Sequence, residues 1–245
     1  MLLKFLAADG PYGYARRHRV LEVICMVTLL LEIVWVSWTL VRGVRAAEQG
    51  VALMVMFSCG YLVADLLSGV AHWAGDTLGS ETMPVFGRHV IHHFRYHHID
   101  PKKLLRHDFI QTNGNACITS VLTLTPILLC LSPKPGFTFY ATAVVASTLV
   151  WLFGTNQFHK WAHADKRPRV ITWLQNFGII LSPKHHALHH AEPYDVNYCI
   201  THGHLNSLLT RTRFFRRLER MIGWVAPALL HGKHLGQAHD LPAQR

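Results

Sequence analysis

The sequence predicts an all-α membrane protein with about four transmembrane helices and a histidine-rich cytoplasmic helical cap that holds a two-metal site. Half of the 245 residues are hydrophobic and 16% are charged, whereas soluble domains carry ~25% charged residues. Four apolar runs are long enough to cross a bilayer. The 19 histidines form clusters near the ends of these runs. We expect a single domain over residues 1–245.

The first two predicted spans cover residues 20–41 and 51–71. Each is long enough for a hydrocarbon core of ~30 Å. The second span carries Asp65, and an acidic side chain inside a span suggests a functional site. Seven and eleven residues separate Asp65 from His72 and Asp76, so these three side chains should share one face of a helix.

The third and fourth predicted spans cover residues 115–132 and 137–157. Two prolines and a glycine between residues 132 and 136 predict a tight turn that joins them. The fourth span leads directly into His159. The run Ile171–Leu181 is apolar but has only 11 residues, so we expect it to lie at the membrane interface and not to cross the bilayer.

Basic residues predict the orientation of these spans. Segments 1–19, 76–114 and 159–245 contain four, five and twelve lysines and arginines, while the links 42–50 and 132–136 contain two and one. Because cytoplasmic segments are enriched in Lys and Arg, both termini and the cap formed by 76–114 and 159–245 should face the cytoplasm. The histidine clusters then lie on one side of the membrane.

Net charge and cysteine spacing exclude two other classes of protein. A net charge of +10 is compatible with nucleic acid or with an anionic membrane surface, and the apolar spans decide for the membrane and against nucleic acid. None of the five cysteines forms a C-x-x-C pair, which excludes cysteine-type zinc ribbons.

The last basic segment contains an amphipathic pattern with two interpretations. A helix with this pattern lies on anionic lipid or covers the cytoplasmic cap, and the pattern favours neither. The apolar stripe consists of Phe214, Phe215, Leu218, Met221 and Ile222, and Arg213, Arg216, Arg217 and Arg220 occupy the other faces.

Three histidine clusters predict the metal site. Within each cluster the imidazoles lie about one helical turn apart and can point the same way. Together they offer more ligands than one ion uses, since zinc takes four positions, so two metals are the economical interpretation. The clusters are His93-x-x-x-His97-His98, His159-x-x-x-His163 and His186-x-x-His189-His190, and His72 stands alone at the end of the second span.

The absence of two motifs narrows the metal chemistry. The chain has neither the H-E-x-x-H motif of zinc proteases nor the Glu-x-x-His of soluble di-iron bundles. An imidazole-dominated site suits iron, zinc, copper or nickel. A metal transporter or sensor is an alternative, but transporters hold their ligands near the middle of the membrane. Ligands at span ends favour chemistry on a molecule that lies in the bilayer and is reached from its surface. Oxygen-dependent attack on an unactivated lipid C–H bond would require redox-active iron, because no side chain can abstract that hydrogen.

Several stretches between about Asp65 and Asn206 together resemble one known family. They are Asp65–Thr77, Tyr96–Pro101, Arg106–Gly114, Asn156–His163, Leu181–His186 with His189-His190-x-x-Pro193, Tyr198–Thr201 and Leu205–Asn206. In combination they resemble the Kua/CarF family of lipid desaturases, the plasmanylethanolamine desaturases. The two named histidine boxes of that family match 159–163 and 186–190.

The resemblance implies a site with two iron ions. The implied iron ligands are His72, His97, His98, His159, His163, His186, His189 and His190. Behind them, residues that would orient the ligands are Asp65, Asp76, His107, Asp108, His185 and Asn206, with His202 and His204 as further candidates. Asp76 could itself be a ligand. His89, His92 and His93 are not recognised as part of the family pattern.

The resemblance also implies an activity and its partners. The enzyme would use O2 and two electrons to convert the 1-O-alkyl ether of an ethanolamine phospholipid into a vinyl ether, which makes a plasmalogen. No Gly-x-Gly-x-x-Gly fingerprint is present, so a separate carrier such as cytochrome b5 or ferredoxin would supply the electrons. We expect a bacterial inner membrane or the endoplasmic reticulum as the location, with the site on the cytoplasmic side.

The alternative within the same enzyme class is an acyl-lipid desaturase or hydroxylase, because a plastid relative of the family acts on acyl chains. In either case metal binding is expected to depend on pH. Imidazoles must be neutral to bind a metal, so it should leave as the pH falls through ~6.5, the value of a free imidazole.

Overall fold

The described part of the chain is helical throughout. A computed structural model describes residues 16–84, 87–131 and 136–230, and no strand occurs within these ranges. The long helices are α2 (Arg16–Gly43), α3 (Ala47–Thr77), α5 (Phe109–Cys130) and α6 (Phe137–His163). The shorter elements are η2 (Gly87–Ile91), α4 (His92–Ile99), η3 (Pro101–Arg106), α7 (Arg169–Asn176), α8 (Pro183–Ala187), α9 (Asn206–Arg211), α10 (Phe214–Val225) and η4 (Pro227–Leu229).

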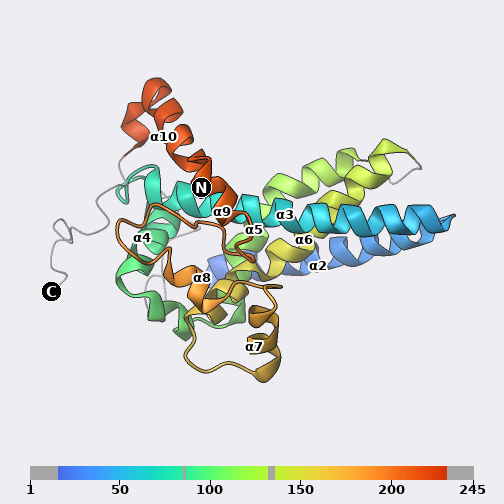
Figure 1. Cartoon of the computed structure of the whole chain (residues 1–245), viewed down its shortest axis with the longest axis horizontal. Coiled ribbons are helices and arrows are strands. Elements are labelled where there is room, and N and C mark those ends of the chain that lie inside the picture. The colour runs from blue at the N-terminus through green and yellow to red at the C-terminus, as the bar shows by residue number, and fades with distance from the viewer. Residues whose placement is uncertain (1–15, 85–86, 132–135, 231–245) are drawn as a thin grey trace.

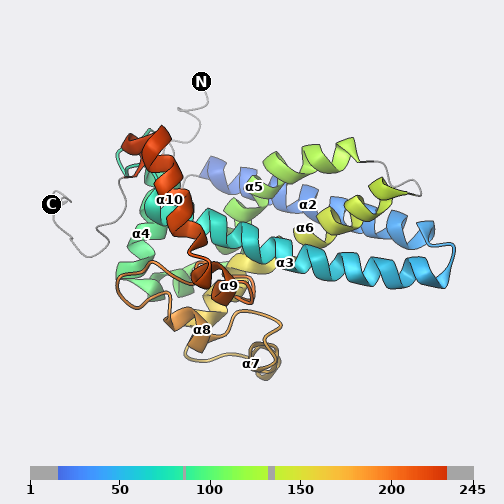
Figure 2. The same ribbon diagram turned by 45° about the horizontal axis from the view of Figure 1, so that its top comes forward.

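The four long helices run side by side as an elongated bundle, and the shorter elements form a cap at one end of it (Figures 1 and 2). Each long helix is long and apolar enough to cross a membrane. The predicted all-α fold with four membrane-spanning helices is therefore confirmed, and the chain is a multi-pass membrane protein. The expected turn at 132–135 lies outside the described residues.

The helices differ from the predicted spans mainly at the cap end. α3 and α6 continue past residues 71 and 157, to Thr77 and His163. α5 begins at Phe109, earlier than the predicted 115, because the carboxylate of Asp108 accepts a hydrogen bond from the Gln111 amide and caps the helix. The added turns of α3 and α6 carry polar and histidine side chains beyond the predicted spans on continuous helix.

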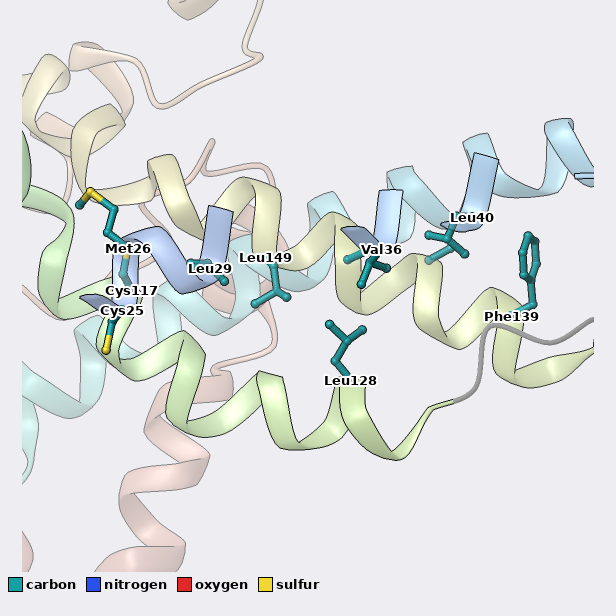
Figure 3. Close-up of a cluster of buried hydrophobic side chains, with 11 residues drawn as sticks. Cys25, Met26, Leu29, Val36, Leu40, Cys117, Leu128, Phe139 and Leu149 are labelled. Carbon is teal, nitrogen blue, oxygen red and sulfur yellow. The ribbon is translucent and has the colours of Figure 1, made fainter. Parts of the chain in front are cut away.

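Close packing holds the bundle together without a large apolar core. Figure 3 shows the buried cluster in which Leu29 of α2, Leu128 of α5 and Leu149 of α6 meet. A Cβ atom on Gly60 of α3 would lie 2.5 Å from the Ser147 Cβ of α6, so only glycine permits this approach. Small residues at helix contacts are typical of membrane bundles, where lipid supplies no hydrophobic drive for helix association.

The acidic residues of the first span have partners inside the bundle. Glu32 accepts a 2.8 Å hydrogen bond from the Thr125 hydroxyl of α5. Glu22 is buried, and its carboxylate lies 3.3 Å from the His18 imidazole. Ionisable groups inside a membrane protein face the bundle and find polar partners there, as both glutamates do.

Two amphipathic segments lie in the cap. In α7, Ile171 is buried while Val170 and Trp173 are exposed. The predicted run 171–181 is helical only in its first part, because α7 ends at Asn176. Aromatic side chains are enriched at membrane interfaces, and the interfacial position of this run stays a prediction.

The α10 helix covers the cap with most of its apolar stripe. Phe215 is buried against Trp73 and Tyr198, and the Trp73 indole donates to Glu219 at 3.3 Å. Phe214, Leu218 and Ile222 also pack against this cluster, whereas Met221 is 63% and Trp224 90% exposed. The covering interpretation is therefore correct for most of the apolar stripe, and lipid contact by Met221 and Trp224 stays a prediction.

The basic segments predict that the cap faces the cytoplasm. A reporter fused to the C-terminus should therefore be active on the cytoplasmic side, and one inserted in the link 44–46 should be active on the opposite side. Protease protection or reporter activity in intact cells measures this. A C-terminal signal from the non-cytoplasmic side would contradict the orientation.

Candidate metal centre

The cap ends of α3 and α6 carry four of the nine side chains that converge at the site. His72 and Asp76 project from the last turns of α3, and His159 and His163 from the last turns of α6. Residues four apart share a helix face, so each pair points the same way. The pairs lie on the rigid extensions of helices that the bundle already holds in place.

α4, α8 and the turn after α8 carry the remaining five. His97 and His98 lie in the last turn of α4. In α8, Ser182 caps the helix by accepting from the His185 amide, and Pro183 takes the first helical position, where its missing N–H costs nothing. The amides of the two following histidines, His189 and His190, both donate to the His186 carbonyl, which continues the turn.

The first group of ligand atoms contains only imidazoles. It consists of His97, His159, His163, His186 and His190, whose ligand atoms lie within 4.8 Å of one another. The Nε2 atom of His186 lies 2.8 Å from that of His159, 2.8 Å from that of His163 and 3.0 Å from that of His190. His186 is thus the centre of this group.

These distances fit a metal ion better than a hydrogen-bond network. Two nitrogens bound at ~2.1 Å and at right angles lie about 3 Å apart. A neutral imidazole has one N–H to donate, so the convergent Nε2 atoms cannot all be satisfied by one another. Within the described residues, the buried Nε2 atom of His97 has no hydrogen-bond partner. A cation between the rings would satisfy these lone pairs.

The second group contains a carboxylate. It consists of His72, Asp76, His98 and His189, all buried. The Oδ2 atom of Asp76 lies 3.1 Å from the Nε2 atom of His98, 3.5 Å from that of His72 and 3.6 Å from that of His189. Within the described residues, the Nε2 atoms of His72 and His189 have no hydrogen-bond partner, as expected of ligand atoms that face a metal position.

Backbone carbonyls set the orientation of two of these rings. The Nδ1 atom of His72 lies 3.1 Å from the Tyr198 carbonyl oxygen, and that of His189 lies 2.8 Å from the Val196 carbonyl oxygen. A carbonyl only accepts, so Nδ1 carries the hydrogen and Nε2 keeps its lone pair. This arrangement is common behind metal-binding histidines. Sequence reasoning missed both carbonyls, because a backbone carbonyl leaves no trace in residue identity.

The two groups are neighbours, and they divide the sequence clusters between them. Ring centroids lie 5.0 Å apart for His98 and His190 and 5.5 Å apart for His189 and His190. The expectation that His186, His189 and His190 point one way is therefore wrong for His189. α8 ends at Ala187, and the bond from His189 to Val196 turns that ring towards Asp76.

Comparison with known proteins identifies the family. A family model described as the lipid desaturase domain matches residues 61–228. The chain belongs to the lipid desaturase family. The resemblance seen in the motifs between Asp65 and Asn206 is confirmed, and the chain is a lipid desaturase, an oxidoreductase. No solved structure matches it.

Named relatives of this desaturase come from bacteria, animals and plants. It is 41% identical to plasmanylethanolamine desaturase of Myxococcus xanthus over 228 residues. The matched region covers 91% of this chain and 79% of the relative. The chain is 43% identical over 169 residues to plasmanylethanolamine desaturase 1 of Mus musculus, covering 66% of this chain and 62% of the relative. With the chloroplastic fatty acid desaturase 4 of Arabidopsis thaliana it shares 37% identity over 163 residues, 65% of this chain and 48% of the relative.

Asp65 of the desaturase holds a loop and lies in neither group. Its carboxylate accepts hydrogen bonds from the amides of His202, Gly203 and Leu205 at 3.0, 2.9 and 3.1 Å, and His202 Nδ1 lies 3.4 Å from it. His204 donates its amide to the His202 ring. The buried charge is thus fully paired. It fastens the segment that follows Tyr198 to α3, and its role in orienting ligands stays a prediction.

Asn206 fastens the same segment from its other end. Its side-chain amide accepts from the Cys199 amide at 2.9 Å and donates to the Cys199 carbonyl at 3.0 Å. It also lies 3.2 Å from the His185 ring. Cys199 follows Tyr198, whose carbonyl faces the His72 ring, so Asn206 and His185 lie next to the segment that borders the second group, and their role in orienting ligands stays a prediction.

The other predicted residues lie outside both groups. The His107 carbonyl accepts a hydrogen bond from Lys160. The Gln111 amide and, less strongly, the Arg19 guanidinium lower the pKa of the Asp108 carboxyl, which caps α5. Roles for His107 and Asp108 in orienting ligands stay predictions. His92 pairs with Glu81 at 2.7 Å.

The two remaining histidines of the 89–98 stretch are not in the groups either. His93 lies in α4 but is not a member of either group. The side chain of His89 lies outside the described residues.

Burial favours the neutral form of four imidazoles in the two groups. It is the largest cause of the lowered pKa in each of the four, and neighbouring histidines add to it. The pKa values of His97 and His186 lie well below the usual range, that of His189 falls to about 4 and that of His190 to about 2. Neutral imidazole is the form that binds a metal, so metal release should need a lower pH than the ~6.5 of a free imidazole.

Metal-free desaturase should lose stability as the pH falls from about 6.5 to about 4. In this window His189 is protonated in the unfolded chain but stays neutral in the folded protein, so a lower pH favours unfolding. A pKa lowered to about 4 corresponds to about 3 kcal/mol for this residue. Unfolding midpoints of chelator-treated protein between pH 4 and 7.5 measure the effect. A smaller slope is expected for His189→Asn, and an unchanging midpoint for the wild type would contradict the prediction.

Proposed function

We propose that this lipid desaturase is a di-iron enzyme that converts the 1-O-alkyl ether of an ethanolamine phospholipid into a vinyl ether. Two hydrogens leave the adjacent carbons next to the ether oxygen. One O2, two electrons and two protons are consumed with them, and two waters are released. The observation that carries the proposal is the pair of adjacent histidine groups at the cap ends of α3 and α6. The names of the Myxococcus and mouse relatives support the substrate.

The nine convergent side chains would hold the two irons. The five histidines of the first group would hold one, and His72, His98, His189 and Asp76 the other. Imidazole with carboxylate suits iron. When bound, iron supplies the one-electron and O2 chemistry that no side chain provides.

The chain's own residues prepare this site. The carbonyls of Tyr198 and Val196 keep two Nε2 lone pairs directed inward. All four residues of the second group are buried, which would limit the access of bulk water to a metal held there. Asp76 is the one carboxylate among the nine, so most of the positive charge on the metals stays uncompensated. A strongly oxidising site, as removal of an ether C–H hydrogen requires, is the expected consequence.

The height of the site in the membrane supports an ether lipid as substrate. His72 directly follows the predicted span 51–71, which as a helix is about 32 Å long, and the hydrocarbon core is ~30 Å thick. The site is then near the level of the lipid glycerol. The first two carbons of an O-alkyl chain lie at this level, whereas the middle of an acyl chain lies deeper.

An acyl-lipid desaturase is the second candidate. It is favoured by the similarity to fatty acid desaturase 4 of Arabidopsis thaliana, because the same histidine clusters could serve a bond near the carboxyl end of an acyl chain. A hydroxylase would use them as well. Product analysis separates these reactions, since only the first gives an acid-labile vinyl ether.

The electrons would come from a separate carrier such as cytochrome b5 or ferredoxin, because the sequence holds no dinucleotide fingerprint. The cap would meet this carrier in the cytoplasm. The protein would lie in a bacterial inner membrane or in the endoplasmic reticulum.

Expression in a cell without plasmalogens should produce vinyl-ether ethanolamine lipids. His163→Ala and His190→Ala should each lower the product at least a hundredfold, because each removes a ligand atom from the first group. The matched control is His92→Ala, which removes a histidine of the same cap that pairs with Glu81 and should stay near wild type. Lipid mass spectrometry measures the product. New acyl double bonds without vinyl ethers would favour the second candidate.

Purified active desaturase should contain two irons per chain. His163→Ala in the first group and His189→Ala in the second should each reduce the content to one iron or less, because each group loses a ligand. Elemental analysis of the folded protein measures this, with His92→Ala as the control. Active protein with one zinc and no iron would refute the di-iron proposal.

A further inference from the structure

The cap contains an open cavity beside the second histidine group. Its volume is about 440 Å³, and it lies between the segment that precedes Tyr198 and the corner from α9 to α10. Leu209 and Phe215 form an apolar part of its wall, and Asp195, Thr210, Arg213 and Arg216 supply polar groups. None of these polar residues belongs to the metal groups, and the mechanism above leaves the cavity without a role.

We propose that this cavity binds the phosphoethanolamine headgroup of the lipid substrate. The inference rests on the proposed function, because it assigns a recognition site to the same substrate. A phosphoethanolamine carries a negative phosphate and a positive ammonium a short distance apart. The cavity offers both complementary charges together with a hydroxyl.

Two arginines suit the phosphate. A guanidinium binds phosphate oxygens through two parallel hydrogen bonds, and Arg213 and Arg216 both line the cavity. Within the described residues, the Arg213 side chain takes part in no ion pair, so it is available to an anion. Its backbone at φ 50° starts α10 from the left-handed region, an uncommon conformation for a residue with a side chain.

Asp195 suits the ammonium. Its carboxylate already pairs with Arg216, so the two opposite charges are held side by side within the cavity. A primary ammonium donates three N–H groups, like that of lysine, and Asp195 accepts them. A phosphocholine has no N–H to donate, and an anionic headgroup has no cation to place there. The cavity should therefore prefer ethanolamine over both.

The cavity lies close enough to the metal groups to serve them. Val196 lines it, and the carbonyl of the same residue accepts the hydrogen bond from His189 at 2.8 Å. In an ether phospholipid only a few bonds separate the phosphate from the first carbon of the alkyl chain. A headgroup in this cavity would place that carbon near the histidine groups.

Binding of two matched lipids to the full-length desaturase tests the proposal. The probes are 1-O-alkyl glycerophosphoethanolamine lipid and its phosphocholine counterpart, measured by native mass spectrometry of purified protein. Asp195→Asn should weaken ethanolamine binding about tenfold, the loss of one charge-assisted contact, and leave choline binding unchanged. Asp195→Glu should keep most of the preference. Arg213→Gln should weaken both lipids, because the phosphate is common to them.

The matched control is Asp165→Asn, which removes another aspartate of the cap that pairs with a basic residue, Lys102 at 2.8 Å, away from the cavity. It should bind both lipids as wild type does. Unchanged ethanolamine preference in folded Asp195→Asn would overturn the proposal. If that variant unfolds, unchanged binding of both lipids to Arg213→Gln would overturn it instead.

Turnover, measured separately, distinguishes this inference from the proposed function. Vinyl ether formation with the same headgroup preference in wild type and Asp195→Asn would overturn the headgroup site and leave the function standing. Ethanolamine binding that depends on Asp195, in a protein that makes no vinyl ether, would support the site and refute the function.

Discussion

The convergence of eight imidazoles and one carboxylate in a buried space is the constraint on which the rest of the structure depends. Uncharged Nε2 atoms about 3 Å apart repel through their lone pairs, and burial removes the water that would otherwise satisfy them. Such a cluster is stable when a cation lies between the rings. These side chains meet because α3 and α6 extend into the cap, Ser182 caps the short α8, and the segment Val196–Tyr198 packs against the rings.

The layer behind the ligands explains residues that a ligand search alone would misplace. Asp65 and Asn206 do not reach the metal groups, yet they fasten the two ends of the segment whose Tyr198 carbonyl orients His72. Each is buried and has several hydrogen-bond partners. A buried polar network specifies one geometry when its members are satisfied, and here it fixes the backbone segment whose Tyr198 carbonyl faces the His72 ring.

The apolar helices explain where the histidine-bearing turns lie along the chain. Polar loops do not lie in lipid, and the turns that carry His72, His159 and His163 follow the apolar runs of α3 and α6 directly. Under the proposed function, the histidine groups and the cavity of α9 and α10 would meet the first chain carbons and the headgroup of one lipid at the same corner of the cap.

Local pattern alone determined the four spans, the residue types of the site and the pairs on single helices. Run length selects a membrane helix, and four-residue spacing puts His159 beside His163 whatever surrounds them. Tertiary packing decided the rest. Histidines that are neighbours in sequence belong to different groups, as His97 and His98 do, and likewise His189 and His190. Asp76 lies in one group with three histidines. Asp65 lies in neither group and holds the loop that contains residues 202–205. The reason is physical: periodicity sets distances within one helix, whereas grouping depends on how helices cross and on backbone carbonyls that no residue type encodes.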